Sequence, residues 1–245
     1  MTPAQGHVVI TGTAGGIGAA LASHFIDLGW QVTGIDRTPA PGPLARAANC
    51  TTVEADITDE AAMEAAFAAA AERGPVRAVI ANAAVTDRDH HRVVDMPYDV
   101  WRGVLRVNVD GAFLTARCAA RRMSDGGGNI IFVTSSLARL ADAQAGDAPY
   151  CTSKAAVEML TRVLAIELAP EGINVNTLFP SVMIDTGFFA HWPETERAGL
   201  APATLLNETA RFLATLPAGA ATGRSLDQQR WDEDAAYRAR WEDLA

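Results

Sequence analysis

The sequence predicts an α/β protein built on a doubly wound, mostly parallel sheet with helices on both faces. Short runs rich in β-branched residues alternate with longer, alanine-rich stretches of helical period through residues 1–180. Because parallel strands need crossover connections, this alternation places helices on both sides of one sheet. The chain of 245 residues suits one large domain, and no linker-like segment interrupts the alternation. We therefore predict a single domain over residues 1–245.

Each predicted element is bounded by residues that start or stop it. The predicted strands cover residues 7–11, 31–36, 51–57, 77–83, 129–135 and 173–179. Helices are expected over residues 16–28, 59–73, about 97–123 and from about 150 onward. Gly29 and Gly74 should end two of them and Thr58 should cap one, because glycine ends helices and hydroxyl side chains cap their first turn. Pro97 suits a first helical turn, and the last of these helices should stop before Pro170.

Composition and charge exclude several classes of protein. Apolar residues make up 49% and charged residues 20%, which is ordinary for a folded soluble protein. A net charge of −9 argues against nucleic acid or a membrane surface as the partner, because both attract basic patches. No apolar run is long enough to span a bilayer, and the first residues do not resemble a signal peptide. Scattered cysteines without a CxxC pair indicate reduced thiols and a cytoplasmic protein, and the scattered histidines suggest no metal site.

A glycine-rich loop, TGTAGGIG, follows the first predicted strand. Without side chains, its backbone can approach a pyrophosphate, whose charge then lies on N–H groups at the helix N-terminus. The spacing is wider than that of the GxGxxG fingerprint, and glycines also serve ordinary turns and helix starts. The position between a strand and a helix favours a dinucleotide site. The candidate cofactor-binding residues in this loop are Gly12, Gly15, Gly16, Ile17 and Gly18.

The second strand ends in an acidic residue, Asp36, which is followed by Arg37. A carboxylate at this position can accept hydrogen bonds from both ribose hydroxyls of an adenosine, and it would repel a 2′-phosphate. Asp36 therefore favours NAD over NADP as the cofactor. Arg37 could hold such a phosphate, although a solvated surface charge is its simpler interpretation.

Further candidates follow the third and fourth strands, where ligands bind in open α/β sheets. Asp56, with Ile57 beside it, could accept a hydrogen bond from an adenine amino group or could simply flank a helix. Asn82 and Ala83 follow the next strand. The Asn82 amide could contact the adenosine ribose or could lock its own loop.

Taken in order, several motifs resemble those of the classical short-chain dehydrogenases/reductases. They are TGTAGGIG, Asp36, the NAA of residues 82–84, Asn108, the serine pair at 135 and 136, and YCTSK at 150–154. The likeness covers about residues 7–180. It implies a single-domain Rossmann fold, a nicotinamide cofactor, and reversible hydride transfer between an alcohol and a ketone or aldehyde.

The resemblance also implies catalytic roles. Tyr150 matches the acid/base that exchanges the hydroxyl proton, and Lys154, the only lysine of the chain, follows one helical turn later. Both would contact the nicotinamide ribose, and the ammonium would lower the pKa of the phenol. Without the other motifs, this pair would be interpreted as a surface feature of a helix. Ser136 matches the residue that binds the substrate oxygen, although it lies one residue further from Tyr150 than is usual. Asn108 matches the asparagine that kinks its helix and holds a relay water.

Beyond the sixth strand, the match to the family is looser. Pro180 and Thr186 match residues that bind the nicotinamide amide, and main-chain contacts from Ile184 would belong to the same site. Ser181 replaces the usual glycine, and Thr186 falls one residue later than expected. Ala84 also stands where glycine is common. These departures concern the nicotinamide side of the site rather than the adenosine side.

Two segments near the end bear on substrate and assembly. Residues 182–205 fall where the family keeps a substrate-binding loop, and their aromatic residues predict either an apolar wall or ordinary core packing. An apolar wall would favour a moderately hydrophobic or cyclic carbonyl compound over a phosphorylated one. The charged segment from about 227 to 245, with a helix expected over about 232–243, departs most from the family. Homodimers or homotetramers through the helices at 97–123 and 150–169 are implied by the resemblance.

The sequence therefore predicts an NAD(H)-dependent oxidoreductase that interconverts a secondary alcohol and a ketone by hydride transfer with tyrosine acid/base catalysis. Among enzymes, the alternative is a dihydrodiol or cyclic-alcohol dehydrogenase of a degradative or biosynthetic pathway. Outside enzymes, the alternative is a dinucleotide-binding sensor or scaffold. Besides further copies of the chain, the expected partner is a small-molecule alcohol or carbonyl substrate.

Overall fold

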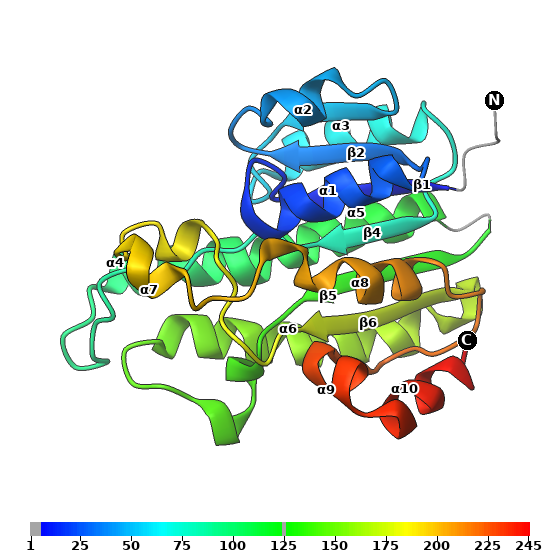
Figure 1. Ribbon diagram of the computed structural model, residues 1–245. Coiled ribbons are helices and arrows are strands. Elements are labelled where there is room, and N and C mark those ends of the chain that lie inside the picture. Colours follow the sequence, from blue (N-terminus) through cyan, green and yellow to red (C-terminus); the bar gives the residue numbers. More distant parts are fainter. Residues whose placement is uncertain (1–5, 124–125) are drawn as a thin grey trace.

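The computed structural model describes residues 6–123 and 126–245 and contains a sheet of seven strands (Figure 1). All neighbouring strands are parallel, in the order β3-β2-β1-β4-β5-β6-β7. The strands are β1 (His7–Thr11), β2 (Gln31–Asp36), β3 (Cys50–Glu54), β4 (Ala78–Ala81), β5 (Gly128–Val133), β6 (Ile173–Phe179) and β7 (Ser225–Asp227). The central strands β1, β4, β5 and β6 are buried along their whole length, as expected for a sheet covered on both faces.

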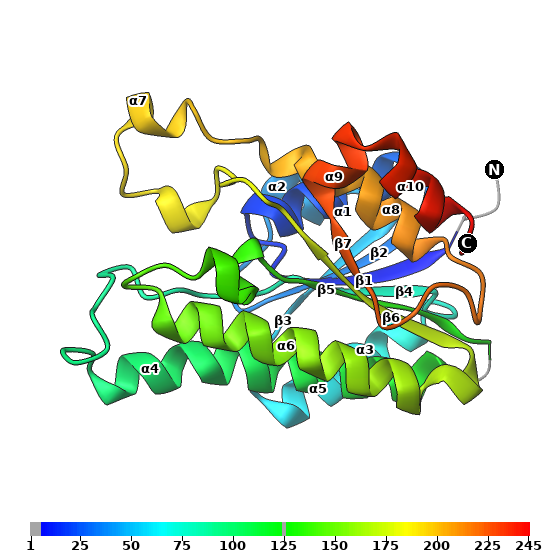
Figure 2. The same cartoon turned by 90° about the horizontal axis from the view of Figure 1, so that it is seen from below.

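Helices cover both faces of the sheet (Figure 2). One face carries α1 (Gly16–Asp27), α2 (Gly42–Arg46), α8 (Asn207–Ala214), α9 (Gln228–Glu233) and α10 (Ala235–Glu242). The other face carries α3 (Glu60–Ala71), α4 (Tyr98–Leu105), α5 (Gly111–Met123) and α6 (Ala148–Glu167). The short helix α7 (Glu194–Arg197) projects beyond the sheet. Among the helices of the described residues, none is long and apolar enough to cross a membrane.

Two apolar clusters hold these layers together. Leu21, Phe25 and Trp30 belong to the cluster between the sheet and α1 and α8. Met63 and Phe67 belong to the cluster between the sheet and α3, α5 and α6. All five side chains are at most 2% exposed, and burial of such surface is the main stabilising contribution to a fold. The strand ends are therefore carried on a rigid scaffold.

The predicted fold class is confirmed, and the strand predictions differ from the structure only in their ends. The strands predicted at 7–11, 31–36 and 173–179 have the predicted bounds. Those predicted at 51–57, 77–83 and 129–135 end at Glu54, Ala81 and Val133. Their last predicted residues leave the sheet and form loops at its carboxyl edge.

Two details of the helix predictions are corrected. The N-cap of α3 is Asp59, whose carboxylate accepts a hydrogen bond from the Ala62 N–H at 3.0 Å, and not Thr58. Thr58 instead donates its hydroxyl to Asp56. The long helix predicted after Pro97 is divided into α4 and α5 by a π-helical turn over Arg106–Asp110.

The charged C-terminal segment forms two helices, α9 and α10, rather than the single helix predicted over about 232–243. Asp234 lies between them and caps α10 by accepting a hydrogen bond from the Tyr237 N–H at 2.9 Å. Trp231 and Trp241 pack on Phe212 of α8, with ring centres 4.6 and 6.5 Å away. This segment is therefore part of the domain, and α8, which it covers, has no counterpart among the predicted helices.

The strand order reverses between β1 and β4, and the strands point toward one edge of the sheet (Figure 1). Open α/β sheets bind their ligands outside the carboxyl ends of the strands at such a switch point. The loops after β1, β4, β5 and β6 meet at this edge, and they carry most of the candidate site residues.

Candidate active site

The loop after β1 requires glycine at two positions because other backbone segments contact it. Gly12 has a φ of +78°, and a Cβ there would lie 2.9 Å from both Asn82 Nδ2 and the Cα of Ala83. A Cβ on Gly18 would lie 2.0 Å from the carbonyl oxygen of Gly12. Asn82 locks this contact by donating from Nδ2 to the Thr11 carbonyl at 3.0 Å. Of the two roles open to Asn82 in the sequence, the structure shows the locking role.

The N-terminus of α1 has the properties of an anion site. Its N-cap, Gly15, provides no side-chain cap, and no acidic residue lies in the first turn. Nothing lies within 4 Å of the place that a Gly15 Cβ would take. The Ile17 side chain packs against the core, so its N–H is the group that a ligand can meet. The open space beside Gly15 and the partial positive charge at the N-terminus of α1 suit a pyrophosphate group, which would meet Gly15, Gly16 and Ile17.

The segment after β6 lies across this glycine loop. A Cβ on Gly16 would lie 3.2 Å from the Thr186 Cβ and Cγ2, so these two residues face each other closely. Pro180 directly follows β6. Ile184 is 4% exposed and pairs with Ala201 in an isolated bridge. The Thr186 Oγ1 accepts from the Phe188 N–H at 3.3 Å, and the buried Ile184 can meet a ligand only through its main chain.

Asp36 holds the glycine loop at the end of β2. Its Oδ2 accepts a hydrogen bond from the Ala14 N–H at 2.9 Å, and its Oδ1 accepts from the N–H and hydroxyl of Thr38, both at 3.0 Å. A carboxylate has about four acceptor sites, so Asp36 can still accept from a ribose hydroxyl. Arg37 is exposed, and its charge helps to lower the pKa of Asp56.

Asp56 and Ile57 differ in what they offer a ligand. Asp56 is exposed, and its Oδ1 accepts from the N–H and hydroxyl of Thr58, both at 2.8 Å. The bond from the Thr58 N–H is the main cause of a lowered Asp56 pKa. Ile57 is 7% exposed and fills the space beside Gly111, where a Cβ would lie 2.4 Å from the Ile57 Cδ1. Asp56 therefore presents a charged side chain, and Ile57 only its backbone.

Tyr150 and Lys154 lie on successive turns of α6. Lys154 is 5% exposed, and its Nζ donates a hydrogen bond to the Val133 carbonyl at 2.8 Å. The same Nζ lies 5.6 Å from the centre of the Tyr150 ring. Phe188 packs edge-on against that ring, with the ring centres 6.0 Å apart. The tyrosine therefore lies between a buried ammonium and the predicted substrate loop.

Burial sets the protonation of both groups. It raises the pKa of Tyr150 to about 12, and the Ser135 side chain opposes the shift by hydrogen bonding. It lowers the pKa of Lys154 to about 8, opposed by the Glu158 carboxylate. Lys154 is not among the causes of the Tyr150 shift in this structure, where its ammonium bonds to Val133 and lies over the ring face, so the predicted lowering of the Tyr150 pKa by Lys154 stays a prediction. At neutral pH the phenol is protonated, which is the form that a general acid needs.

The structure distinguishes the two serines after β5. Hydrogen bonding by the Ser135 side chain lowers the pKa of Tyr150 against the larger effect of burial, and the Ser135 Oγ accepts from the Leu137 N–H at 3.2 Å. Ser136 begins a 3₁₀ turn, Ser136–Ala138. Ser135 therefore joins Ser136 as a candidate for the catalytic serine, and the assignment of Ser136 stays a prediction.

Asn108 ties the distorted helix to the loop after β4. It is 2% exposed and lies in the π-helical turn. Its Oδ1 accepts from the Val85 N–H at 2.8 Å, and its Nδ2 donates to the Val85 carbonyl and to Ser153 Oγ, both at 2.9 Å. Ser153 in turn donates to the Tyr150 carbonyl at 2.7 Å. The predicted helix distortion at Asn108 is present, and a relay water there stays a prediction.

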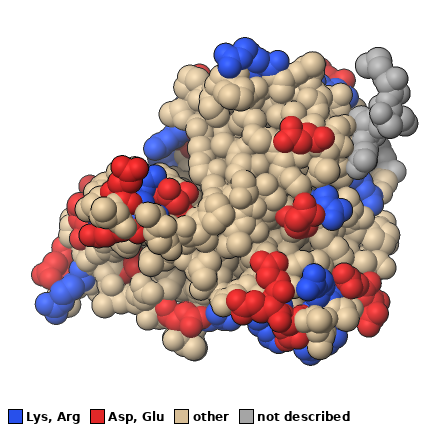
Figure 3. Space-filling view, viewed as in Figure 1, with Lys and Arg blue, Asp and Glu red and all other residues tan. Residues whose placement is uncertain are grey.

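The predicted substrate loop is closed at its base and carries α7 at its tip. The Asp185 N–H donates to the Ala201 carbonyl at 2.8 Å, which joins the two ends of the loop. Asp185 also holds Arg197 of α7 by two bonds at 2.9 and 3.0 Å. Figure 3 shows α7 on a charged lobe that stands out from the body of the molecule. Phe189 and Trp192 pack together, with ring centres 4.8 Å apart.

Sequence reasoning did not find Glu158, which lies one turn after Lys154 on α6. Its Oε1 accepts from the hydroxyls of Thr134, Thr177 and Ser225 at 2.6, 2.9 and 3.1 Å. Thr134 directly follows β5, Thr177 lies within β6, and Ser225 begins β7. The i, i+4 spacing from the only lysine is the one signal in the sequence that could have pointed to it.

One group of side chains in the loop after β4 has the residue types of a metal site, but its members hydrogen bond to one another. Ligand atoms of Asp87, Asp89 and His91 lie within 4.8 Å of one another. Asp87 already accepts from the Asp89 N–H at 3.1 Å and from the His91 N–H and ring at 2.9 Å. The group is therefore explained as a bonded turn in the loop after β4.

A switch-point site with an open anion cradle, a buried lysine, a tyrosine and a serine defines a class of protein, the nicotinamide-dependent α/β oxidoreductases. The chain belongs to the short chain dehydrogenase family, whose model matches residues 6–197. Members of this family bind a nicotinamide dinucleotide and act on CH–OH groups, and this chain is an enzyme of that kind.

Known proteins similar to this chain differ in substrate and cofactor. One is the chloroplastic NADPH-dependent aldehyde reductase 2 of Arabidopsis thaliana, 31% identical over 74% of this chain and 73% of its own length. Another is the cis-4-hydroxycyclohexanecarboxylate dehydrogenase of Sinomonas cyclohexanicum, 33% identical over 83% of each chain. A solved structure of 3-ketoacyl-(acyl-carrier-protein) reductase from Brucella melitensis, complexed with NADH, is 26% identical with a TM-score of 0.81, over 91% of this chain and 96% of that one.

Proposed function

We propose that this enzyme uses NAD(H) to interconvert a secondary alcohol and a ketone, with Tyr150 as the acid/base. The observation that carries the proposal is the position of Tyr150 on α6 beside the buried Lys154, with the Ser135 side chain acting on the Tyr150 pKa by hydrogen bonding. Asn108 and Ser153 fix the turn of α6 that bears the tyrosine. A sensor or scaffold would have no need of this arrangement.

In the proposed mechanism, each residue has one task. In the direction of reduction, the Tyr150 phenol gives its proton to the carbonyl oxygen, and Ser135 donates a hydrogen bond that stabilises charge developing there. In the direction of oxidation, the same groups accept the hydroxyl proton and orient the alcohol. Lys154 provides a buried positive charge beside the ring, which favours the phenolate once the proton has left. The bound nicotinamide supplies or accepts the hydride.

The preference for NAD rests on Asp36. Its carboxylate is held by Ala14 and Thr38 at the end of β2, where a 2′-phosphate would meet negative charge. Exposed Arg37 lies beside it and is the residue that would favour NADP. Titration of the protein with NADH and with NADPH tests the preference, and tighter NADPH binding would contradict it.

The substrate loop supports a moderately hydrophobic substrate. Phe188 lies against Tyr150, and Phe189 and Trp192 extend the aromatic surface, so the loop offers apolar contacts close to the acid/base. A cyclic alcohol is the favoured alternative within this class, and the name of the Sinomonas relative, a hydroxycyclohexanecarboxylate dehydrogenase, supports it.

We also propose that the enzyme is a homo-oligomer, at least a dimer, in the cytoplasm. Exposed apolar side chains gather on α5 and α6, which lie side by side (Figure 2). They are Phe113 and Val163, each 43% exposed, and Met159 and Ile166, 65% and 68% exposed. Such a surface on neighbouring helices is typical of an interface between copies. Three free cysteines support a reducing compartment.

A panel of open-chain and cyclic secondary alcohols and their ketones, assayed with NAD(H) and NADP(H), tests the proposal. We expect turnover with NAD(H) on at least one apolar member of the panel. No turnover with any member, together with tight NADH binding, would favour the sensor or scaffold instead.

A further inference from the structure

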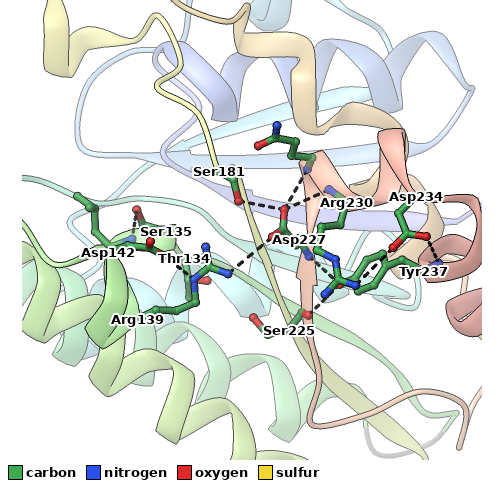
Figure 4. A network of polar contacts seen from close by, with 12 residues as sticks. Thr134, Ser135, Arg139, Asp142, Ser181, Ser225, Asp227, Arg230, Asp234 and Tyr237 are labelled. Atoms are coloured by element: carbon green, nitrogen blue, oxygen red, sulfur yellow. Dashed lines mark hydrogen bonds and ion pairs between the residues drawn. The ribbon is translucent and has the colours of Figure 1, made fainter.

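Asp227 connects the C-terminal segment to the turn after β6 (Figure 4). It ends β7, is 6% exposed, and caps α9 by accepting from the Gln229 and Arg230 N–H groups at 3.1 and 3.3 Å. The same oxygen, Oδ1, accepts from the Ser181 hydroxyl at 3.0 Å. A carboxylate held by several donors is fixed in position, and it fixes those donors in turn.

The other oxygen of Asp227 faces the loop that follows the candidate catalytic serine. Arg139 Nη1 lies 3.7 Å from Asp227 Oδ2, and Arg139 Nε donates to Asp142 at 2.7 Å. The Arg139 guanidinium also lies 5.0 Å from the centre of the Phe179 ring. Because Phe179 ends β6 two residues before Ser181, Asp227 and Arg139 enclose this turn from two sides (Figure 4).

The C-terminal helices α9 and α10 fix the backbone at Asp227. The Tyr237 hydroxyl of α10 accepts from the Asp227 N–H at 3.0 Å and donates to the Ser225 carbonyl at 3.3 Å. Arg230 of α9 lies 4.3 Å from the centre of the Tyr237 ring. The end of β7 is therefore anchored to both helices of the charged segment.

We infer that Asp227 is a positioning residue for cofactor binding, which fixes through Ser181 the turn that meets the nicotinamide ring. The inference rests on the proposed function, because the contact between that turn and the ring belongs to the proposal. The inferred role explains two departures from the family together: the serine at 181 and the charged C-terminal segment. A serine hydroxyl can donate to a buried carboxylate, whereas a glycine cannot, and the C-terminal helices hold that carboxylate in place.

Binding of two ligands to Ser181→Ala tests the inference. NADH carries the nicotinamide ring, and ADP-ribose is the same molecule without it. Loss of the hydroxyl should weaken NADH binding about tenfold, the effect of losing about 1.4 kcal/mol from a hydrogen bond to a charged group. The affinity for ADP-ribose should stay unchanged. Glu233→Gln on α9, which removes a charge that contacts only the Gln229 side chain among the described residues, is the matched control and should change neither affinity.

A second variant, Asp227→Ala, shows whether the hydroxyl acts through the carboxylate. Adding Ser181→Ala in that background should weaken NADH binding no further, because the shared interaction is already absent. If Asp227→Ala does not fold, the inference is decided by the affinities of Ser181→Ala for NADH and for ADP-ribose. Equal weakening of both ligands, or of neither, in Ser181→Ala would overturn the inference while leaving the proposed function intact. A wild-type protein that binds neither NADH nor ADP-ribose would contradict the proposed function itself.

Discussion

Lys154 Nζ lies 5.6 Å from the centre of the Tyr150 ring while it donates a hydrogen bond to the Val133 carbonyl at 2.8 Å. The ammonium thus reaches from α6 to the end of β5 and passes the face of the tyrosine. Only a long, narrow side chain with a compact charge fits this 5% exposed position. The single lysine of a chain with 20 lysines and arginines therefore occupies a place where arginine would not serve.

Lys154→Arg should be far from conservative. The wide, planar guanidinium overfills a buried site, so we expect a loss of stability of about 1–3 kcal/mol. Turnover should fall by at least about a hundredfold, because the charge no longer lies where proton transfer needs it. Thermal unfolding and steady-state kinetics measure the two effects. A variant with wild-type kinetics would show that the site needs only a positive charge.

Stability should depend on pH through Lys154. Burial lowers the pKa of Lys154 to about 8 from 10.5, so between these values the unfolded chain binds more protons than the folded protein. The free energy of unfolding should therefore rise with pH through this window, as the cost of a buried charge disappears. Compared with Lys154→Met, which lacks the group, the wild type should gain up to about 3 kcal/mol. Urea unfolding of both proteins across the window measures the difference, and a difference that does not change with pH would contradict the shift.

Replacing each of the two serines after β5 should have clearly different effects on turnover. Ser135→Ala removes the hydroxyl that we propose stabilises charge on the substrate oxygen, so turnover should fall on the order of a hundredfold. Ser136→Ala is the matched control and should leave turnover nearly unchanged. Measuring turnover and NADH affinity for both variants checks this assignment. The reverse result would assign the role to Ser136, as the sequence predicts.

Assembly should depend on the exposed faces of α5 and α6. Ile166→Glu places a charge on a side chain that is 68% exposed in the isolated chain and that we expect to be buried between copies. Light scattering should show a smaller particle for this variant than for the wild type. Leu140→Glu, at a side chain that is 99% exposed after β5, is the control and should leave the mass unchanged. An unchanged mass for Ile166→Glu would place the interface elsewhere.

The sequence predicted the scaffold of the site better than its details, for physical reasons. Glycine or proline stands on both sides of the strands at 7–11 and 173–179 and shortly before the strand at 31–36, so these strands could be bounded from the sequence. The choice between Ser135 and Ser136 depended on the path of an irregular loop, which spacing does not determine. The raised pKa of Tyr150 depends on burial by residues distant in sequence.

The hydrogen bond between Ser181 and Asp227 also could not be predicted from the sequence. Ser181 and Asp227 are 46 residues apart. Ser181 departs from the family pattern and Asp227 begins the charged C-terminal segment, but nothing in the sequence indicated that they bond to each other. Their contact follows from the pairing of β6 with β7, which places Phe179 beside Asp227.

The central claim is that Tyr150 is the acid/base of an NAD(H)-dependent alcohol and ketone oxidoreductase. Tyr150→Phe removes only the hydroxyl, so the measurement is turnover of this variant beside its affinity for NADH. Tyr98→Phe, at a tyrosine that is 73% exposed, is the matched control and should keep wild-type turnover. We expect Tyr150→Phe to bind NADH almost as the wild type does and to show no detectable turnover. Turnover close to that of the wild type would contradict the account.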